Sequence, residues 1–247
     1  MRELKPLPIV FLPGLDGTAQ LRAALVERVS QSRATTVIAY PDDPALDYAK
    51  LDAFVQARLP QGRFAVLGES FSGPAAIRIA HGQGDRVAGL ILLSTFARNP
   101  WPRWLAHLVP LLDARICPDA FLDWLMLGDR GAAGQQELLH RVAAAMPRAV
   151  LHSRARAALR VDVSNLLAAT KCPVLCLAGA SDWLIERRCA THIQSLRPDC
   201  ELIWLDGAHN LAMTHVDELA TVIERFCASC DPSSTHIGLN GVVKHRP

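Results

Sequence analysis

Six short, continuous runs of apolar residues recur along this 247-residue chain, and most are separated by segments with the three-to-four-residue spacing of amphipathic helices. Strands that are apolar on both faces are typical of parallel sheets covered by helices on both sides. The alternation predicts an α/β fold with an open, mostly parallel sheet of about six strands flanked by helices. The apolar runs span 8–12, 36–40, 64–67, 89–93, 173–177 and 201–205, and the helical patterns span 19–29, 48–59, 74–81, 187–196 and 216–227.

One interval interrupts this alternation. About eighty residues between Leu93 and Pro173 contain no strand pattern, only helical stretches separated by prolines. We interpret residues 98–165 as a helical cap inserted into a core formed by residues 1–97 and 166–230. Residues 231–247 are polar and aperiodic, and we expect this tail to be disordered.

A serine lies in the turn between the third apolar run and the helix that follows it. The segment Gly68-Glu69-Ser70-Phe71-Ser72-Gly73 approximates the pattern G-x-S-x-G, with Ser72 in place of the second glycine. In that pattern a sharp strand-to-helix turn presents the serine hydroxyl at the carboxyl edge of the sheet. Ser70 is therefore the candidate nucleophile, and the alternative is a serine that only caps a helix.

Two further residues have the chemistry that such a serine needs. A histidine takes the hydroxyl proton, and a carboxylate orients the histidine and stabilises its positive charge. Asp182 lies in a short turn after the fifth apolar run, and His209 lies in the loop after the sixth. The order serine, aspartate, histidine is the one used when such a triad is built on an α/β sheet. We predict that these three residues form a catalytic triad, while helix capping for Asp182 and a surface-loop position for His209 are the alternatives.

The loop after the first apolar run has the composition of an oxyanion hole. In Pro13-Gly14-Leu15-Asp16-Gly17-Thr18, two glycines allow the backbone to turn so that the N–H of Leu15 points at a developing oxyanion. The second donor would be the N–H of Phe71, directly after the nucleophile. We expect Asp16 to form the turn and Glu69 to pack or hydrogen-bond beside the serine.

Together these segments resemble the α/β-hydrolase superfamily over about residues 8–228. Within it the chain is similar to compact, capped bacterial hydrolases whose oxyanion loop reads Pro-Gly-Leu-Asp-Gly-Thr, and distantly to the carrier-protein methyl esterase of biotin synthesis. The resemblance implies Ser70 as nucleophile, Asp182 as acid and His209 as base. It also implies Leu15 and Phe71 as the oxyanion donors.

The insertion suggests two binding features. Trp101, Trp104 and Trp124 would form an apolar ceiling over the nucleophile that favours an acyl substrate, or they would only seal the cap onto the sheet. Residues 141–160 hold five arginines and no acidic residue, which would suit an acyl carrier protein or a coenzyme A phosphate; the alternative is a solvated helical face. The arginines are Arg141, Arg148, Arg154, Arg156 and Arg160.

Composition and charge bear on whether the chain binds nucleic acid, spans a membrane, is secreted or holds a metal. A net charge of +2 does not indicate nucleic-acid binding, and no apolar run reaches the ~18 residues of a membrane span. The first residues lack the apolar core of a secretory signal, so we expect a cytoplasmic protein. Seven cysteines form no disulfide framework, and Cys227 and Cys230 make a single C-x-x-C pair. We expect neither a metal nor a cofactor.

The sequence thus predicts a serine esterase that cleaves small-molecule carboxylic esters through an acyl-enzyme. Three alternatives stay open. One is an esterase or thioesterase for acyl groups on a carrier protein or coenzyme A. Another is carbon–carbon cleavage with the same triad. The third is a ligand-binding protein that has the fold without turnover.

Overall fold

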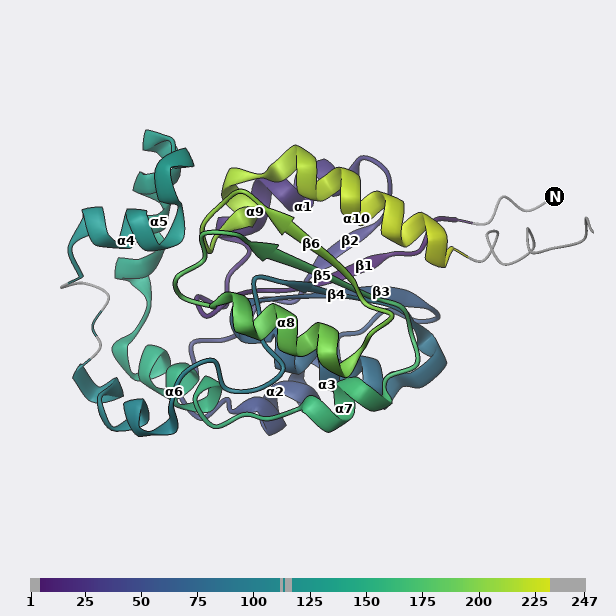
Figure 1. The fold of residues 1–247 in the computed structure, drawn as a ribbon, viewed down its shortest axis with the longest axis horizontal. Coiled ribbons are helices and arrows are strands. Elements are labelled where there is room, and N and C mark those ends of the chain that lie inside the picture. The colour runs from purple at the N-terminus through teal and green to yellow at the C-terminus, as the bar shows by residue number, and fades with distance from the viewer. Residues whose placement is uncertain (1–4, 112, 114–116, 232–247) are drawn as a thin grey trace, which may run out of the picture.

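Six strands form a single sheet in the order β2-β1-β3-β4-β5-β6, and every neighbouring pair is parallel (Figure 1). The computed structural model describes residues 5–111, 113 and 117–231. Nearly all of the expected tail, residues 232–247, lies outside the described residues. The strands are β1 (Ile9–Leu12), β2 (Thr35–Val37), β3 (Phe64–Glu69), β4 (Val87–Leu93), β5 (Val174–Gly179) and β6 (Glu201–Leu205). The predicted α/β class and parallel sheet are confirmed.

Helices cover both faces of the sheet. On one face α1, α9 and α10 pack together, and on the other lie α2, α3, α7 and α8 (Figure 1). The middle strands β1, β3, β4 and β5 are therefore buried throughout, as their continuous apolar sequences require. The helices are α1 (Ala23–Ser30), α2 (Tyr48–Gln56), α3 (Gly73–Gln83), α4 (Asp119–Met126), α5 (Ala133–Ala145), α6 (Arg148–Ala158), α7 (Ser164–Ala169), α8 (Arg187–Leu196), α9 (Leu211–Thr214) and α10 (Val216–Cys230).

The strand order reverses between β1 and β3. From β1 the chain goes outward to β2 and then crosses back to β3, so the loops that follow β1 and β3 leave the sheet side by side. The register pairs Leu12 with Gly68 and thereby sets the loop that starts at Pro13 beside Ser70. Such a reversal creates the crevice in which open α/β sheets bind ligands.

The second strand is shorter than its sequence predicts. It ends at Val37, because the chain then bends toward the loop after β1. Ile38 still donates its N–H to Phe11 O at 3.0 Å, but Tyr40 donates its N–H to Gly17 O at 2.8 Å. Residues 38–40 therefore support the oxyanion loop instead of extending the sheet.

The segment between β4 and β5 leaves and re-enters the core at one place. Asn99 N–H donates to Val161 O and Val163 N–H donates to Ala97 O, both at 2.8 Å. Between these points α4, α5 and α6 gather at the end of the molecule to which the strands point (Figure 1). The division into a helical cap over residues 98–165 and a core stays our interpretation.

Candidate active site

Ser70 lies in a strained turn at the carboxyl end of β3. Its φ of +49° falls in the left-handed region, which a residue with a side chain adopts only where the surrounding structure enforces it. A 3-10 turn over Ser70–Ser72 joins β3 to α3. Gly68 permits the tight approach of this helix, because a Cβ there would lie 2.6 Å from the Cβ of Ala76. The local sequence thus produces the sharp serine turn that was predicted.

The three candidate triad residues form one hydrogen-bonded chain. Ser70 Oγ lies 2.9 Å from His209 Nε2, and His209 Nδ1 lies 2.8 Å from Asp182 Oδ2. When Nδ1 carries the proton and donates it to Asp182, Nε2 is free to accept the hydroxyl proton of Ser70. All three side chains are buried, and Ser70 keeps 9% of its surface exposed.

The carboxylate of Asp182 is held in place by its own loop. Its Oδ1 accepts hydrogen bonds from Leu184 N–H at 2.9 Å and Ile185 N–H at 2.7 Å, which leaves Oδ2 for the histidine. Asp182 therefore orders its turn and also orients His209. Burial alone would lower the pKa of His209, but the charge of Asp182, the hydrogen bond to it and the charge of Glu69 together outweigh burial and raise the pKa above 6.5.

The loop after β1 lies directly against the serine. A Cβ built on Gly14 would be 3.8 Å from the Cβ of Ser70. Gly17 N–H donates to Gly14 O at 3.0 Å and closes a tight turn with Leu15 inside it. Among the described residues, none accepts a hydrogen bond from the N–H of Leu15 or Phe71. Both N–H groups therefore stay candidate oxyanion donors.

Ser72, which replaces the second glycine of the pattern, has a defined partner set. Its hydroxyl donates a short hydrogen bond to Pro13 O and lies 2.6 Å from the hydroxyl of Tyr40. The side chain therefore ties the serine turn to the start of the oxyanion loop. The sequence pattern identified Ser72 only as the residue in place of the second glycine and indicated neither this role nor that of Tyr40.

A buried arginine makes a second link between the two loops. Arg22, with 1% of its surface exposed, donates Nε–H to Glu69 Oε2 at 2.7 Å and Nη2–H to Asp16 Oδ1 at 2.9 Å. Asp16 also accepts the N–H of Thr18 at 2.9 Å, so it forms the turn as expected and takes part in this ion pair as well. No sequence signal indicated Arg22, since its partners are 6 and 47 positions away.

Two curated relatives carry the same name, pimeloyl-[acyl-carrier protein] methyl ester esterase. The protein from Proteus mirabilis (strain HI4320) is 23% identical over 239 residues, which cover 89% of this chain and 92% of the relative. The protein from Serratia marcescens is 28% identical over 199 residues, which cover 75% of this chain and 78% of the relative. No family model matches the chain.

Solved structures settle the fold. The crystal structure of the enol-lactonase from Burkholderia xenovorans LB400 superimposes with a TM-score of 0.79 and covers 92% of this chain and 94% of that one, at 15% identity. The chain has the α/β-hydrolase fold. In an α/β-hydrolase fold the loops that carry a triad follow the strands at one sheet edge, and the loops after β3, β5 and β6 occupy that edge here.

The three tryptophans of the insertion, Trp101, Trp104 and Trp124, differ in their surroundings, and their role toward a substrate stays a prediction. Trp104 and Trp124 are 63% and 47% exposed. Trp124 stacks on Trp183, in the loop after Asp182, with ring centroids 6.1 Å apart. Trp101 donates its indole N–H to Leu184 O at 2.9 Å in that same loop. Trp101 and Trp124 therefore both contact the loop that carries Asp182.

One of the five cap arginines does not lie on the surface. Arg154 is 1% exposed and donates to backbone carbonyls of the core, which excludes it as a docking residue for an acidic partner. Arg141, Arg148 and Arg160 are exposed, and Arg156 is half-buried. The expectation of an arginine-rich binding face is therefore wrong for Arg154 and stays a prediction for the other four.

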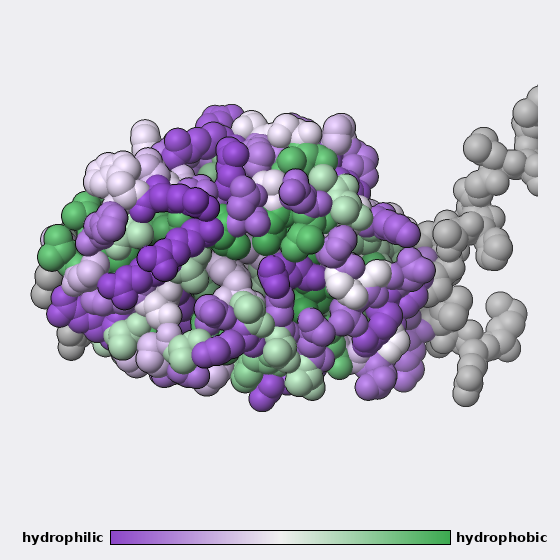
Figure 2. Space-filling view, turned by 90° about the horizontal axis from the view of Figure 1, so that it is seen from below, coloured by the Kyte–Doolittle hydropathy of each residue, from purple (hydrophilic) through white to green (hydrophobic). Residues whose placement is uncertain are grey.

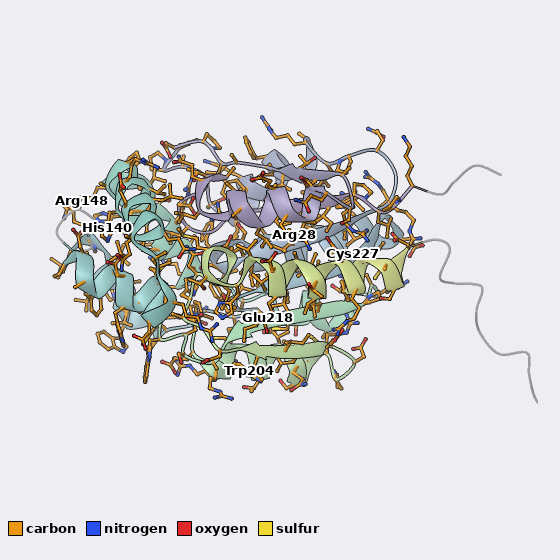
Figure 3. All side chains as sticks on the ribbon, turned by 90° about the horizontal axis from the view of Figure 1, so that it is seen from above. Arg28, His140, Arg148, Trp204, Glu218 and Cys227 are labelled. Carbon is orange, nitrogen blue, oxygen red and sulfur yellow. The ribbon has the colours of Figure 1, made fainter. Side chains whose placement is uncertain are left out.

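The described part of the chain has neither a cluster of metal-ligating side chains nor a disulfide. It contains no group of three or more His, Cys, Asp and Glu side chains that could hold a metal ion. All seven cysteines are unpaired, and burial raises the pKa of the Cys227 thiol to about 12. Cys227 lies on α10, and His140 and Arg148 lie at the cap end of the molecule (Figure 3). None of the described helices is long and apolar enough to cross a membrane.

Proposed function

We propose that this protein is a serine esterase that cleaves carboxylic esters through an acyl-enzyme. The hydrogen-bonded chain from Ser70 through His209 to Asp182 is the observation that carries the proposal. The two curated relatives are named as esterases, which supports a hydrolase. We assign Ser70 as the nucleophile, His209 as the base and Asp182 as the residue that orients it.

In the first half-reaction His209 removes the Ser70 proton as Oγ attacks the ester carbonyl. The oxyanion that develops is stabilised by the N–H groups of Leu15 and Phe71. The protonated histidine then gives its proton to the leaving alcohol, and the acyl group stays on Ser70. Water, activated by the same histidine, attacks the acyl-enzyme and releases the acid. Asp182 stabilises the imidazolium in both halves.

A fluorophosphonate probe and a chain-length series of p-nitrophenyl esters test this assignment. We expect the probe to label the wild type at Ser70, and Ser70→Ala to lose labelling and reduce kcat on the order of 10⁶-fold, as removal of a triad nucleophile does. Ser30→Ala, at an exposed position at the end of α1, is the matched control and should behave as the wild type. A folded wild type that neither reacts with the probe nor hydrolyses any ester of the series would favour the ligand-binding alternative.

A narrower candidate is an esterase for acyl groups on an acidic carrier protein. The relatives' names mention an acyl-carrier-protein substrate. In this chain a hollow of about 730 Å³ between α2 and α6 is lined by Arg156, Arg160 and Tyr48 among others. Tyr48 stacks on Phe71 with ring centroids 4.9 Å apart, so the hollow lies one side chain from the serine turn. Figure 2 shows hydrophilic side chains at the cap end of this face, mixed with hydrophobic ones.

Charge reversal separates the narrow candidate from the general one. The double variant Arg156→Glu with Arg160→Glu should lower kcat/KM on a carrier-bound methyl ester while activity on a free methyl ester is unchanged. Arg63→Glu is the control, because this exposed residue directly precedes β3 at the amino end of the sheet, away from the cap. The wild-type rate on the carrier-bound ester should also fall as salt rises. Equal rates of the double variant and the wild type on both esters exclude carrier recognition at this face.

A further inference from the structure

The oxyanion loop is a four-residue turn whose shape determines where the Leu15 N–H points. Gly17 N–H closes the turn onto Gly14 O at 3.0 Å, and Gly17 has a φ of +74°. A turn of this size, built around glycine, has little stiffness of its own. Its conformation therefore depends on the groups that hold its outward-facing carbonyls and side chains.

The carbonyl of Leu15 is held by the cap. Arg154, from the middle of α6, donates Nη1–H to Leu15 O at 2.8 Å and Nη2–H to Pro41 O at 2.9 Å. Its guanidinium carbon lies 5.8 Å from the centre of the Tyr40 ring. One side chain thus joins the oxyanion loop to the segment after β2. The contact spans 139 positions of sequence between Leu15 and Arg154.

Arg154 lies so close to this turn that only a glycine fits at position 17. A Cβ at position 17 would lie 2.4 Å from Arg154 Nη1 and 2.9 Å from Nη2. The guanidinium therefore occupies the space that a side chain at position 17 would need. Arg154 Nε is buried without a partner among the described residues, so the two terminal nitrogens make the hydrogen bonds of this guanidinium to Leu15 O and Pro41 O.

The opposite side of the same turn is held by the core. Arg22 binds the Asp16 carboxylate at 2.9 Å and the Glu69 carboxylate at 2.7 Å, and Glu69 directly precedes Ser70. The cap also contacts the loop of the base, because Asn210 N–H donates to Met126 O at 2.7 Å. Two arginines thus hold the turn from opposite sides. Arg22, in the core, connects its Asp16 to the residue before the nucleophile, and Arg154, in the cap, binds its backbone at Leu15 O.

We propose that Arg154 is a positioning residue through which the cap holds the oxyanion loop in its catalytic shape. This inference rests on the proposed esterase function, and it adds that docking of α6 is part of the oxyanion hole. A donor must lie at hydrogen-bond distance from the oxyanion as charge develops there. With Leu15 O released, the peptide planes on either side of Leu15 can rotate, and the N–H is no longer aimed at the oxyanion.

Kinetics of Arg154→Met test the proposal. Loss of one oxyanion donor costs 10²–10³-fold, and misplacement by ~1 Å costs ~10²-fold, so we expect kcat to fall roughly 10- to 100-fold with KM changed less than about threefold. Arg58→Met is the matched control. It removes an exposed arginine that also donates to a backbone carbonyl, Phe54 O at 2.9 Å, and it should leave kcat unchanged.

Chemical rescue separates positioning from general support of the fold. Arg154→Ala leaves a space of guanidinium shape between Leu15 O and Pro41 O. Millimolar guanidinium should restore kcat in this variant at least several-fold, whereas the same concentration of urea should not. Arg154→Lys keeps the cation but cannot span both carbonyls as the planar guanidinium does, so its kcat should lie between those of Arg154→Met and the wild type. The lysine variant also provides the measurement if the methionine variant does not fold.

Three results would overturn the inference. One is a folded Arg154→Met or Arg154→Lys enzyme with wild-type kcat. Another is a loss that appears only in KM, and the third is an Arg154→Ala variant that guanidinium does not rescue. The fluorophosphonate probe distinguishes failure of this inference from failure of the proposed esterase function. A wild type that labels at Ser70 while the Arg154 variants label at the same rate refutes the positioning role alone, whereas an unlabelled wild type refutes the esterase.

Discussion

Replacing Arg22 by methionine should destabilise this protein more than any loss of a surface charge. The guanidinium is 1% exposed and lies between two carboxylates whose side chains are 8% and 9% exposed, those of Asp16 and Glu69. Methionine fills much of the same volume but offers no donor. The variant therefore leaves two buried negative charges without a cation between the oxyanion loop and the serine turn.

Removal of one partner from a buried ion pair typically costs about 3–5 kcal/mol of unfolding free energy, because the remaining charge stays desolvated. For a domain of this size about 1 kcal/mol shifts the thermal midpoint by roughly 2–4 °C, so we expect a fall of about 6–20 °C. Removing all three charges together, in Asp16→Asn with Arg22→Met and Glu69→Gln, should recover most of that loss. Urea unfolding at equilibrium and thermal unfolding measure both quantities.

The deficit of Arg22→Met should also depend on pH, through Asp16. Burial tends to raise the pKa of Asp16, but the charge and hydrogen bond of Arg22, together with two hydrogen bonds from Thr18, outweigh burial and hold the pKa below the ordinary 3.8. In the wild type this carboxylate contributes stability that is present above 3.8 and is lost as the pH falls through the lower folded-state pKa. In the variant the contribution of Arg22 is gone while burial still acts, so the folded-state pKa of Asp16 should be higher than in the wild type and the charged form should be less well stabilised at neutral pH. The deficit should shrink on acidification.

The matched control is Arg28→Met. Arg28 lies on α1 and pairs with Asp217 at 3.2 Å, where the two side chains are 35% and 89% exposed (Figure 3). An exposed pair of this kind contributes about 0–1 kcal/mol, so the loss of stability in Arg28→Met should stay within this small range at neutral and acidic pH. A deficit of Arg22→Met that equals that of the control, or that is the same at neutral and acidic pH, would refute the assignment of Arg22 as the buried link.

Three further outcomes follow from the site and its surroundings. Asp182→Asn should lower kcat by about 10⁴-fold, because the carboxylate no longer holds His209 in the productive tautomer. The acidic limb of the pH–rate profile should also move to lower pH, because the charge that raises the pKa of His209 is gone; an unmoved limb would contradict this. Gly68→Ala, whose Cβ would meet atoms at 2.6 Å, should cost about 3 kcal/mol, while Gly82→Ala, which meets nothing within 4 Å, should gain up to about 1 kcal/mol in the same urea titration. Cys227, with a pKa of about 12, should react slowly with iodoacetamide in the folded protein and quickly in urea; rapid labelling of the folded form would show that the thiol is accessible.

Some features could be predicted because they depend on short stretches of sequence. The continuous apolar runs predicted a parallel sheet, and β6 begins and ends at its predicted residues, 201 and 205. The carboxyl ends of parallel strands share one edge, so the positions of Ser70, Asp182 and His209 after three such runs were enough to predict that they meet. The second strand was predicted too long, because the sequence does not show that Tyr40 turns to support the oxyanion loop.

Other features were decided only when distant segments packed together. Arg154 and Arg156 are two positions apart on one helix, yet the first is buried against Leu15 and the second lines a hollow. Nothing in their neighbouring residues distinguishes them, because burial depends on which side of α6 faces the core. The role of Arg22 was likewise not visible in the sequence. Arg22 stabilises the fold only because the register of β1 on β3 brings two carboxylates, Asp16 and Glu69, within hydrogen-bond distance of it. By itself the sequence determined which chemistry lies at the sheet edge, through local patterns of strand, turn and helix. Tertiary packing decided which charged side chains are buried and hold the catalytic groups in place. The reason is that the burial of a side chain depends on neighbours that are distant in the sequence.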